Sequence, residues 1–183
     1  QRQMCIRDRI GFSYTMVGLP DTAVKESYQR VQAAMQQSGL EFPRRRLLIN
    51  LSPADVRKEG ASYDLPIAVG VLASTGKLPV DALKGYMIMG ELSLDGSVLP
   101  IRGALPMSIL ARAKGCKGMI LPKANATEAA VVNNLDVIGV ESLSEVVQFL
   151  SGQIALEPTV VDTRAEFAAE AAAFDFDFNE VRG

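Results

Sequence analysis

The order of apolar and polar residues along the chain predicts strands and helices in alternation. Apolar positions between residues 22 and 37 fall at helical spacing and form one face: Val24, Tyr28, Val31, Ala34 and Met35. Further helices are predicted over residues 65–75, 105–114, a short stretch ending at 132, and 143–150. Strands are predicted over residues 12–17, 47–51, 86–89, 119–121 and 137–140. From residue 114 onward strand and helix alternate, so we expect an α/β fold: a mixed, partly parallel sheet with helices packed on it.

Residue types at the element ends predict the caps and turns. Asp21 or Thr22 is expected to cap the first helix, and Asn125 or Thr127 the short helix. Between residues 91 and 100, apolar residues alternate around Asp95-Gly96, a dipeptide that predicts a hairpin with a tight primed turn.

The stretch from Asn50 to Gly70 predicts a polar site. A buried strand ends at Asn50, a charged loop follows, and the chain turns at Gly60 and presents Ser62 before an apolar helix. Strand, loop, turn and buried helix in this order commonly display a polar site at the edge of a sheet. Asp64 is interpreted as a cap of that helix, and Ser62 is the one hydroxyl placed directly before it.

Composition limits the chemistry that this site could perform. The chain of 183 residues has no histidine, which excludes Ser-His-Asp and Cys-His arrangements and most zinc sites. The net charge of -2 argues against non-specific binding of DNA by the whole surface, although it leaves room for a local basic patch. No GxxxxGK[ST] motif and no run of 18 apolar residues is present in the sequence. Two cysteines are too few for a disulfide scaffold and fit a reducing cytosol.

The ends of the chain differ from its middle. Residues 1–9 are polar and aperiodic, and we interpret them as a non-native artefact joined to the real reading frame. Residues 10–152 form the predicted domain, with strands expected to be missing before Phe12. Residues 153–176 are interpreted as a linker, and residues 177–183 as the entry to a further domain.

Four motifs in a consistent order resemble the ComM/YifB family of Mg-chelatase-like AAA+ ATPases. They are GLPDTAVKES (18–27), NLSPADVRKEGASYDLPIA (50–68), GELSLDGSVLPIRGALPM (90–107) and DFNEVRG (177–183). The resemblance implies an amino-terminal domain similar to the proteolytic domain of Lon, with a ribosomal-protein-like superfamily fold. It also implies that the chain is a fragment ending before the Walker A loop of the ATPase domain.

The same resemblance implies the setting of the parent protein. That protein would bind ATP and Mg²⁺ in the absent AAA+ domain, assemble as a hexamer and act in the bacterial cytoplasm. Its expected activity is that of a branch-migration helicase in DNA recombination during natural transformation. No cofactor or metal site is expected in this part of the chain.

Within the Lon-like region, Ser62 resembles the position of the catalytic serine, but the partner of that serine differs. Lon places a catalytic lysine shortly after a VLPI strand; here Val98–Ile101 is retained, and the position that resembles the lysine is Leu105. A serine hydroxyl is a poor nucleophile unless a base takes its proton, and leucine is no base. We therefore expect no catalytic residue. Lys58, in the loop before the turn, is the alternative base that an unconventional dyad would use.

Three functions follow as hypotheses. The first is a non-catalytic Lon-like domain that serves assembly or contacts a partner or DNA; the second is a Ser-Lys peptidase; the third is part of a magnesium-chelatase-type ATPase. The candidate contacts for DNA or a partner are basic: Arg44, Arg45, Arg46, Arg57, Lys58 and Arg102. The alternative interpretation of these residues is a solvated strand entry and solvated loops.

Overall fold

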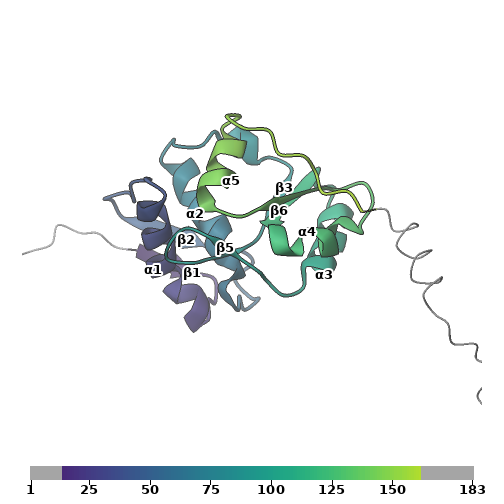
Figure 1. Ribbon diagram of the computed structural model, residues 1–183. Helices are drawn as coiled ribbons and strands as arrows, with labels where there is room; N and C mark the ends of the chain where they lie inside the picture. The colour runs from purple at the N-terminus through teal and green to yellow at the C-terminus, as the bar shows by residue number, and fades with distance from the viewer. Residues whose placement is uncertain (1–13, 162–183) are drawn as a thin grey trace, which may run out of the picture.

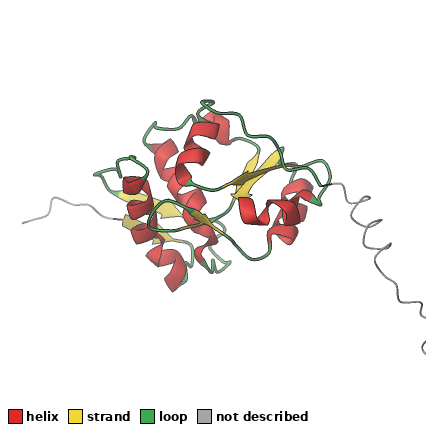
Figure 2. Ribbon diagram, in the orientation of Figure 1, coloured by secondary structure: helices red, strands yellow, loops and turns green. Residues whose placement is uncertain are grey.

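The structure is a computed structural model that describes residues 14–161. The predictions for residues 1–9 and 177–183, and for most of the linker, fall outside the described residues. Between these limits, helices and short strands alternate along the chain (Figures 1 and 2).

The first part of the molecule is a parallel strand pair joined by one long helix. Strands β1 (Tyr14–Val17) and β2 (Leu47–Asn50) run side by side, with Tyr14 opposite Leu47. Helix α1 (Thr22–Gln37) connects them, and Asp21 caps it by accepting from Val24 N at 2.7 Å. The helix expected over residues 22–37 and its cap are thus confirmed.

A central buried helix follows the loop after β2. The 3₁₀ helix η1 (Ala61–Tyr63) leads directly into α2 (Asp64–Ser74), and a further 3₁₀ helix, η2 (Val80–Leu83), follows. Helix α2 lies between α1 and α5 in the view of Figure 1. It buries seven of its eleven residues, which explains why its sequence is apolar on nearly every side.

The second part of the molecule is a parallel three-stranded sheet with helices on both faces. Its strands lie in the order β3-β6-β7, with bounds β3 (Tyr86–Ile88), β6 (Gly118–Pro122) and β7 (Asp136–Val140). Its helices are α3 (Ala104–Ala113), α4 (Lys123–Ala130) and α5 (Leu143–Leu150). The hairpin strands β4 (Glu91–Leu92) and β5 (Val98–Leu99) pair antiparallel.

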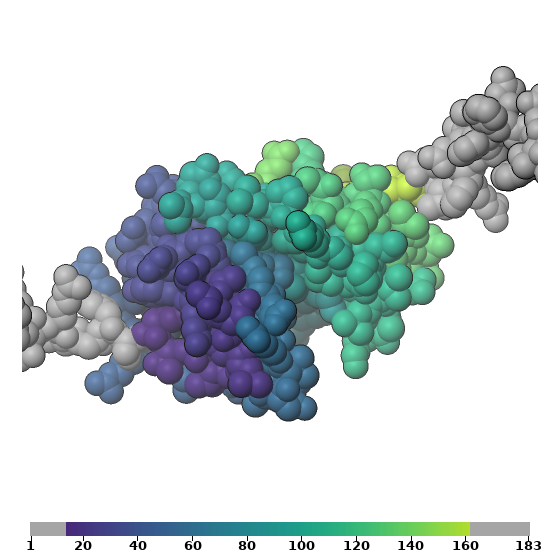
Figure 3. Space-filling model, turned by 90° about the horizontal axis from the view of Figure 1, so that it is seen from below, coloured from purple at the N-terminus to yellow at the C-terminus, as the bar shows by residue number. Residues whose placement is uncertain are grey.

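Successive residues of strand β6 point to opposite faces of the sheet and join different cores. Ile120 belongs to the cluster shared with α1, α2 and α5, whereas Met119 and Leu121 belong to the cluster shared with α3 and α4. The space-filling view shows the two parts of the chain, purple to blue and teal to yellow, meeting along one boundary (Figure 3). The expected α/β class with partly parallel strands is confirmed, and the described strands form three small sheets, two parallel and one antiparallel.

Two local predictions are wrong. Neither Asn125 nor Thr127 caps α4; both lie inside it, because the helix already begins at Lys123, directly after Pro122. The hairpin loop comprises Leu94, Asp95 and Gly96, and the positive φ falls on Gly96 (92°). A loop of this length closes through a turn with glycine in the left-handed region, so the primed two-residue turn does not form.

Candidate functional site

Ser62 sits in a turn that is fixed from both sides. It lies in η1, between Gly60, whose φ of 83° favours glycine, and the first residue of α2. Its carbonyl oxygen accepts from Gly90 N at 2.9 Å, and the carbonyl of Gly90 accepts from Leu65 N at 3.0 Å. The hydroxyl is half-buried, and among the described residues it makes no hydrogen bond, so the predicted role of satisfying backbone donors is not met.

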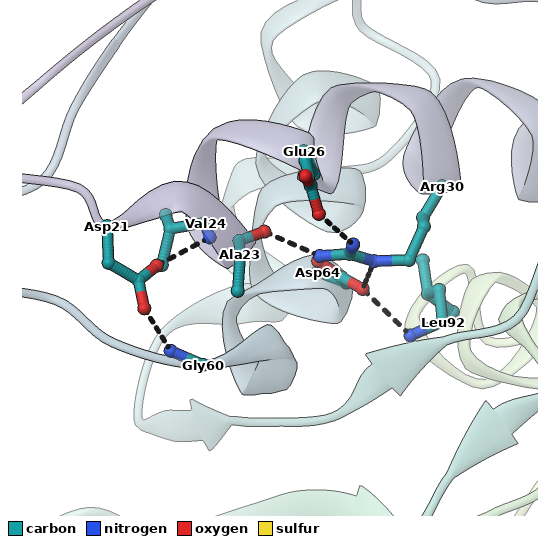
Figure 4. Close-up of polar contacts among 8 residues, drawn as sticks. All are labelled: Asp21, Ala23, Val24, Glu26, Arg30, Gly60, Asp64 and Leu92. Carbon is teal, nitrogen blue, oxygen red and sulfur yellow. Dashed lines mark hydrogen bonds and ion pairs between the residues drawn. The ribbon is translucent and has the colours of Figure 1, made fainter.

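Asp21 fastens this turn to the start of α1 (Figure 4). One carboxylate oxygen caps the helix, and the other accepts from Gly60 N at 3.1 Å. The hydrogen bond from Val24 N is the main cause that lowers the pKa of the Asp21 carboxyl. The orientation of the serine turn therefore depends on a charge at the helix start.

Asp64 forms a buried ion pair and is not a helix cap, which corrects the sequence interpretation. Its side chain is fully buried, and Arg30 of α1 donates to both carboxylate oxygens, at 2.6 Å and 2.9 Å (Figure 4). Leu92 N adds a third hydrogen bond at 3.2 Å. The hydrogen bond with the Asp64 carboxylate raises the pKa of the Arg30 guanidinium. Asp64 thus joins α1, α2 and β4 and has no free oxygen facing a substrate.

The ammonium of Lys58 is directed into its own loop. Only 5% of the residue is exposed, and its ammonium donates to the carbonyl oxygens of Pro53 and Val56, the latter at 2.6 Å. Its backbone also pairs with the chain beside Pro20. No hydrogen bond joins a lysine to the Ser62 hydroxyl in residues 14–161.

Leu105 lies in the first turn of α3, and its backbone is hydrogen-bonded to helix α4. Its backbone N–H donates to Glu128 Oε1 of α4 at 3.0 Å. Just before it, Ile101 is held by the side chain of Asn125, which exchanges two hydrogen bonds of 2.9 Å with the Ile101 backbone. The residue that follows the VLPI segment at the position resembling the lysine is thus a leucine in the first turn of α3.

Five of the six predicted basic contacts are exposed, and one is buried. Arg44, Arg45 and Arg46 are exposed in the segment before β2, and Arg102 is exposed before α3. Arg57 pairs with Glu59 at 3.1 Å, both well exposed. Lys58 is buried, so its ammonium is not offered to a partner.

Sequence reasoning missed a groove beside Arg44 and Arg45. It is walled by α1, by the segment of residues 39–45 and by the end of α2, and its lining includes Tyr28 and Lys77. One signal was available: Gln32 and Gln36 follow Tyr28 at steps of four, giving α1 a polar stripe next to its apolar face.

Two further observations concern metals and membranes. Within residues 14–161 no three acidic, histidine or cysteine side chains gather as a metal site would require. None of the helices in that range combines the length and the hydropathy needed to cross a membrane.

Comparison with known proteins gives one family and two groups of relatives. A family model described as subunit ChlI of Mg-chelatase matches residues 7–125. Competence protein ComM of Haemophilus influenzae is 41% identical over 140 residues, 76% of this chain and 27% of that protein. Protein YifB of Escherichia coli is 42% identical over 154 residues, 82% of this chain and 30% of that protein. Lon protease 2 of Bacillus subtilis is 29% identical over 125 residues, 67% of this chain and 22% of that protein. The chain spans less than a third of each of these relatives.

Proposed function

The chain belongs to the family described as subunit ChlI of Mg-chelatase, and we propose that it is a non-catalytic Lon-like domain of a ComM/YifB-type AAA+ ATPase. The parent ATPase would bind ATP and Mg²⁺ in its AAA+ domain, form a hexamer and act in the bacterial cytoplasm. Its role would lie in DNA recombination during natural transformation, as a branch-migration helicase. The name of the Haemophilus relative, a competence protein, supports this setting.

The observation that carries the proposal is the residue at the lysine-like position, which is Leu105. In addition, among residues 14–161 the ammonium of Lys58 is taken up by two carbonyl oxygens. A serine without a base loses several orders of magnitude in rate, because its hydroxyl stays protonated at neutral pH. A Lon-like scaffold of this kind is suited to docking or assembly, through contacts to neighbouring subunits, a partner protein or DNA.

A peptidase assay tests the loss of catalysis. The 183-residue chain and its Ser62→Ala variant are incubated with an unfolded protein substrate, with a Lon protease as the positive control. We expect no cleavage by either form. Cleavage that is present in the unmodified chain and lost in the variant would contradict the proposal.

A Ser-Lys peptidase is the second candidate, since Ser62 is retained and Lon proteases are among the relatives. The third candidate, part of a magnesium chelatase, is suggested by the family description. An assay of Mg²⁺ insertion into a porphyrin with partner subunits separates it from the other two. The reading frame beyond Gly183 supplies an independent check, since a GxxxxGK[ST] motif is expected there.

A further inference from the structure

An aromatic and basic groove opens on the side of α1, and neither the family description nor the names of the relatives refers to it. It encloses about 1170 Å³ between α1, the loop of residues 39–45 and the end of α2. Its walls contain aromatic rings from three elements and cations from two.

The aromatic residues form a continuous row along the groove. The rings of Tyr14 and Tyr28 lie 4.5 Å apart between centroids and are tilted by 43°. The ring of Phe42 meets Tyr28 edge-on at 5.5 Å. All three residues line the groove and are half-buried, so part of each remains accessible from it. Such rings offer a flat apolar surface on which a planar ligand stacks.

The cations of the groove are not neutralised by carboxylates. Arg44, Arg45 and Lys77 line it and are exposed, and the ion pairs among residues 14–161 involve other side chains. Lys77 Nζ reaches across to the carbonyl oxygen of Glu41 at 3.2 Å, which places an ammonium at the junction of α2 and the loop. Glu41 is the one acidic residue in the lining, so the groove is positive in a chain whose net charge is -2.

We propose that this groove binds single-stranded nucleic acid, with bases stacked on Tyr28 and Phe42 and phosphates held by Arg44, Arg45 and Lys77. Stacking aromatics beside cations that follow the backbone is the usual composition of such sites. A duplex would keep its bases away from the rings, and an acidic peptide would leave the aromatic row unused. The inference deepens the proposed function by naming the ligand of its DNA contact.

The test measures binding of the 183-residue chain to a fluorescein-labelled dT oligonucleotide of 20 nucleotides by anisotropy, between about 20 and 200 mM salt. Low salt is needed because exposed charges are screened beyond about 10 Å at 0.1 M. If three cations neutralise three phosphates, log K should fall with log salt at a slope of about −2, from about −0.7 for each phosphate. The duplex form of the same length is expected to bind more weakly.

Variants separate stacking from charge. Tyr28→Ala should weaken binding about 5- to 150-fold, the range measured for loss of one stacked base, while Tyr28→Phe keeps the affinity. Arg44→Gln with Arg45→Gln should reduce the salt slope by about two-thirds. The matched control replaces Arg112 and Lys114, exposed cations near the end of α3, with glutamine and should leave binding unchanged. Thermal unfolding confirms that each variant folds.

Several outcomes would overturn the proposal: no binding at 20 mM salt, an equal loss in the control variant, or equal affinity for duplex. Displacement of the oligonucleotide by poly-glutamate with Tyr28→Ala unaffected would assign the groove to an acidic protein partner instead. These failures would leave the peptidase result untouched. Conversely, serine-dependent cleavage would overturn the non-catalytic function without changing the binding curve.

Discussion

Replacing Arg30 with leucine would leave the carboxylate of Asp64 buried without its counter-charge. In the structure Asp64 is fully buried, and two of its three hydrogen bonds come from the guanidinium of Arg30. Only the bond from Leu92 N would remain. The variant therefore probes whether this pair holds α1, α2 and β4 together beside the serine turn.

The expected loss follows from the hydrogen bonds that disappear. The two bonds to the Asp64 carboxylate, each contributing about 1.5–3 kcal/mol, give a loss of about 3–6 kcal/mol. The substitution also removes the bond from the Arg30 guanidinium to the carbonyl oxygen of Ala23 at 2.7 Å, which adds to this loss. Breaking a buried ion pair by removing one partner gives about 3–5 kcal/mol. The side chain of Arg30 is 20% exposed, which lets water reach the site and favours the lower end, about 3 kcal/mol.

Urea unfolding followed by circular dichroism measures this change. With a slope of about 2 kcal/mol/M, a loss of 3 kcal/mol moves the midpoint down by about 1.5 M. Lys84→Leu is the matched control, because the Lys84–Asp81 pair is 75% and 87% exposed and should contribute less than about 0.5 kcal/mol.

A double-mutant cycle makes the result specific to the pair. Arg30→Leu combined with Asp64→Leu should be more stable than Arg30→Leu alone, because no unpaired charge is left inside. The reasoning is refuted if Arg30→Leu unfolds within about 0.5 kcal/mol of the unmodified chain, or if the losses of the two single variants simply add.

Three other substitutions test the surroundings of the site. Asp21→Ala should cost about 1–2 kcal/mol, because the first turn of α1 and Gly60 both lose an acceptor. The pKa of Asp21 is lowered in the fold, so its contribution is present above the unfolded value of about 3.9 and is lost as pH falls through the folded value. Asp21→Asn should keep the cap and flatten this acid-side change, measured by urea unfolding at pH 7 and pH 3. Asn125→Ala should cost about 2–4 kcal/mol by urea unfolding, because it strands the N–H and the C=O of Ile101; an unchanged midpoint would disprove the role of this clamp. Gly18→Ala should cost on the order of 3 kcal/mol in thermal unfolding, since φ is 99° and a Cβ would clash with the carbonyl oxygen of Leu51; a variant as stable as the parent would show that the backbone yields there.

Helices α1 and α5 were predictable from the sequence because local rules decide them. Helix α1 begins and ends where its apolar spacing and the Asp21 cap indicate, and α5 runs from Leu143 to Leu150 as expected. The hairpin was predictable in position but not in loop type, since Asp95-Gly96 suits either a two-residue or a longer loop. The choice follows from where the flanking strands pair, which the dipeptide alone does not encode.

The residues of the candidate site were predictable only where they belong to a sequence motif of the family. The contrast between Ser62 and Leu105 came from the order of motifs, and among the described residues the ammonium of Lys58 donates to carbonyl oxygens of its own loop. Lys58 is buried, whereas lysine side chains are usually exposed. Asp64 pairs with Arg30, which is distant from it in the sequence. Their partners depend on how the elements pack, so spacing along the chain gives no sign of them.

The most direct measurement of the central claim is labelling of Ser62 by a fluorophosphonate, which reacts with serines that a base has activated. The 183-residue chain and Ser62→Ala are treated under native conditions, and their intact masses are compared. We expect no adduct on either protein, because the hydroxyl at residue 62 has no base to take its proton. A stoichiometric adduct on the unmodified chain that is absent from Ser62→Ala would contradict the account and establish an active serine.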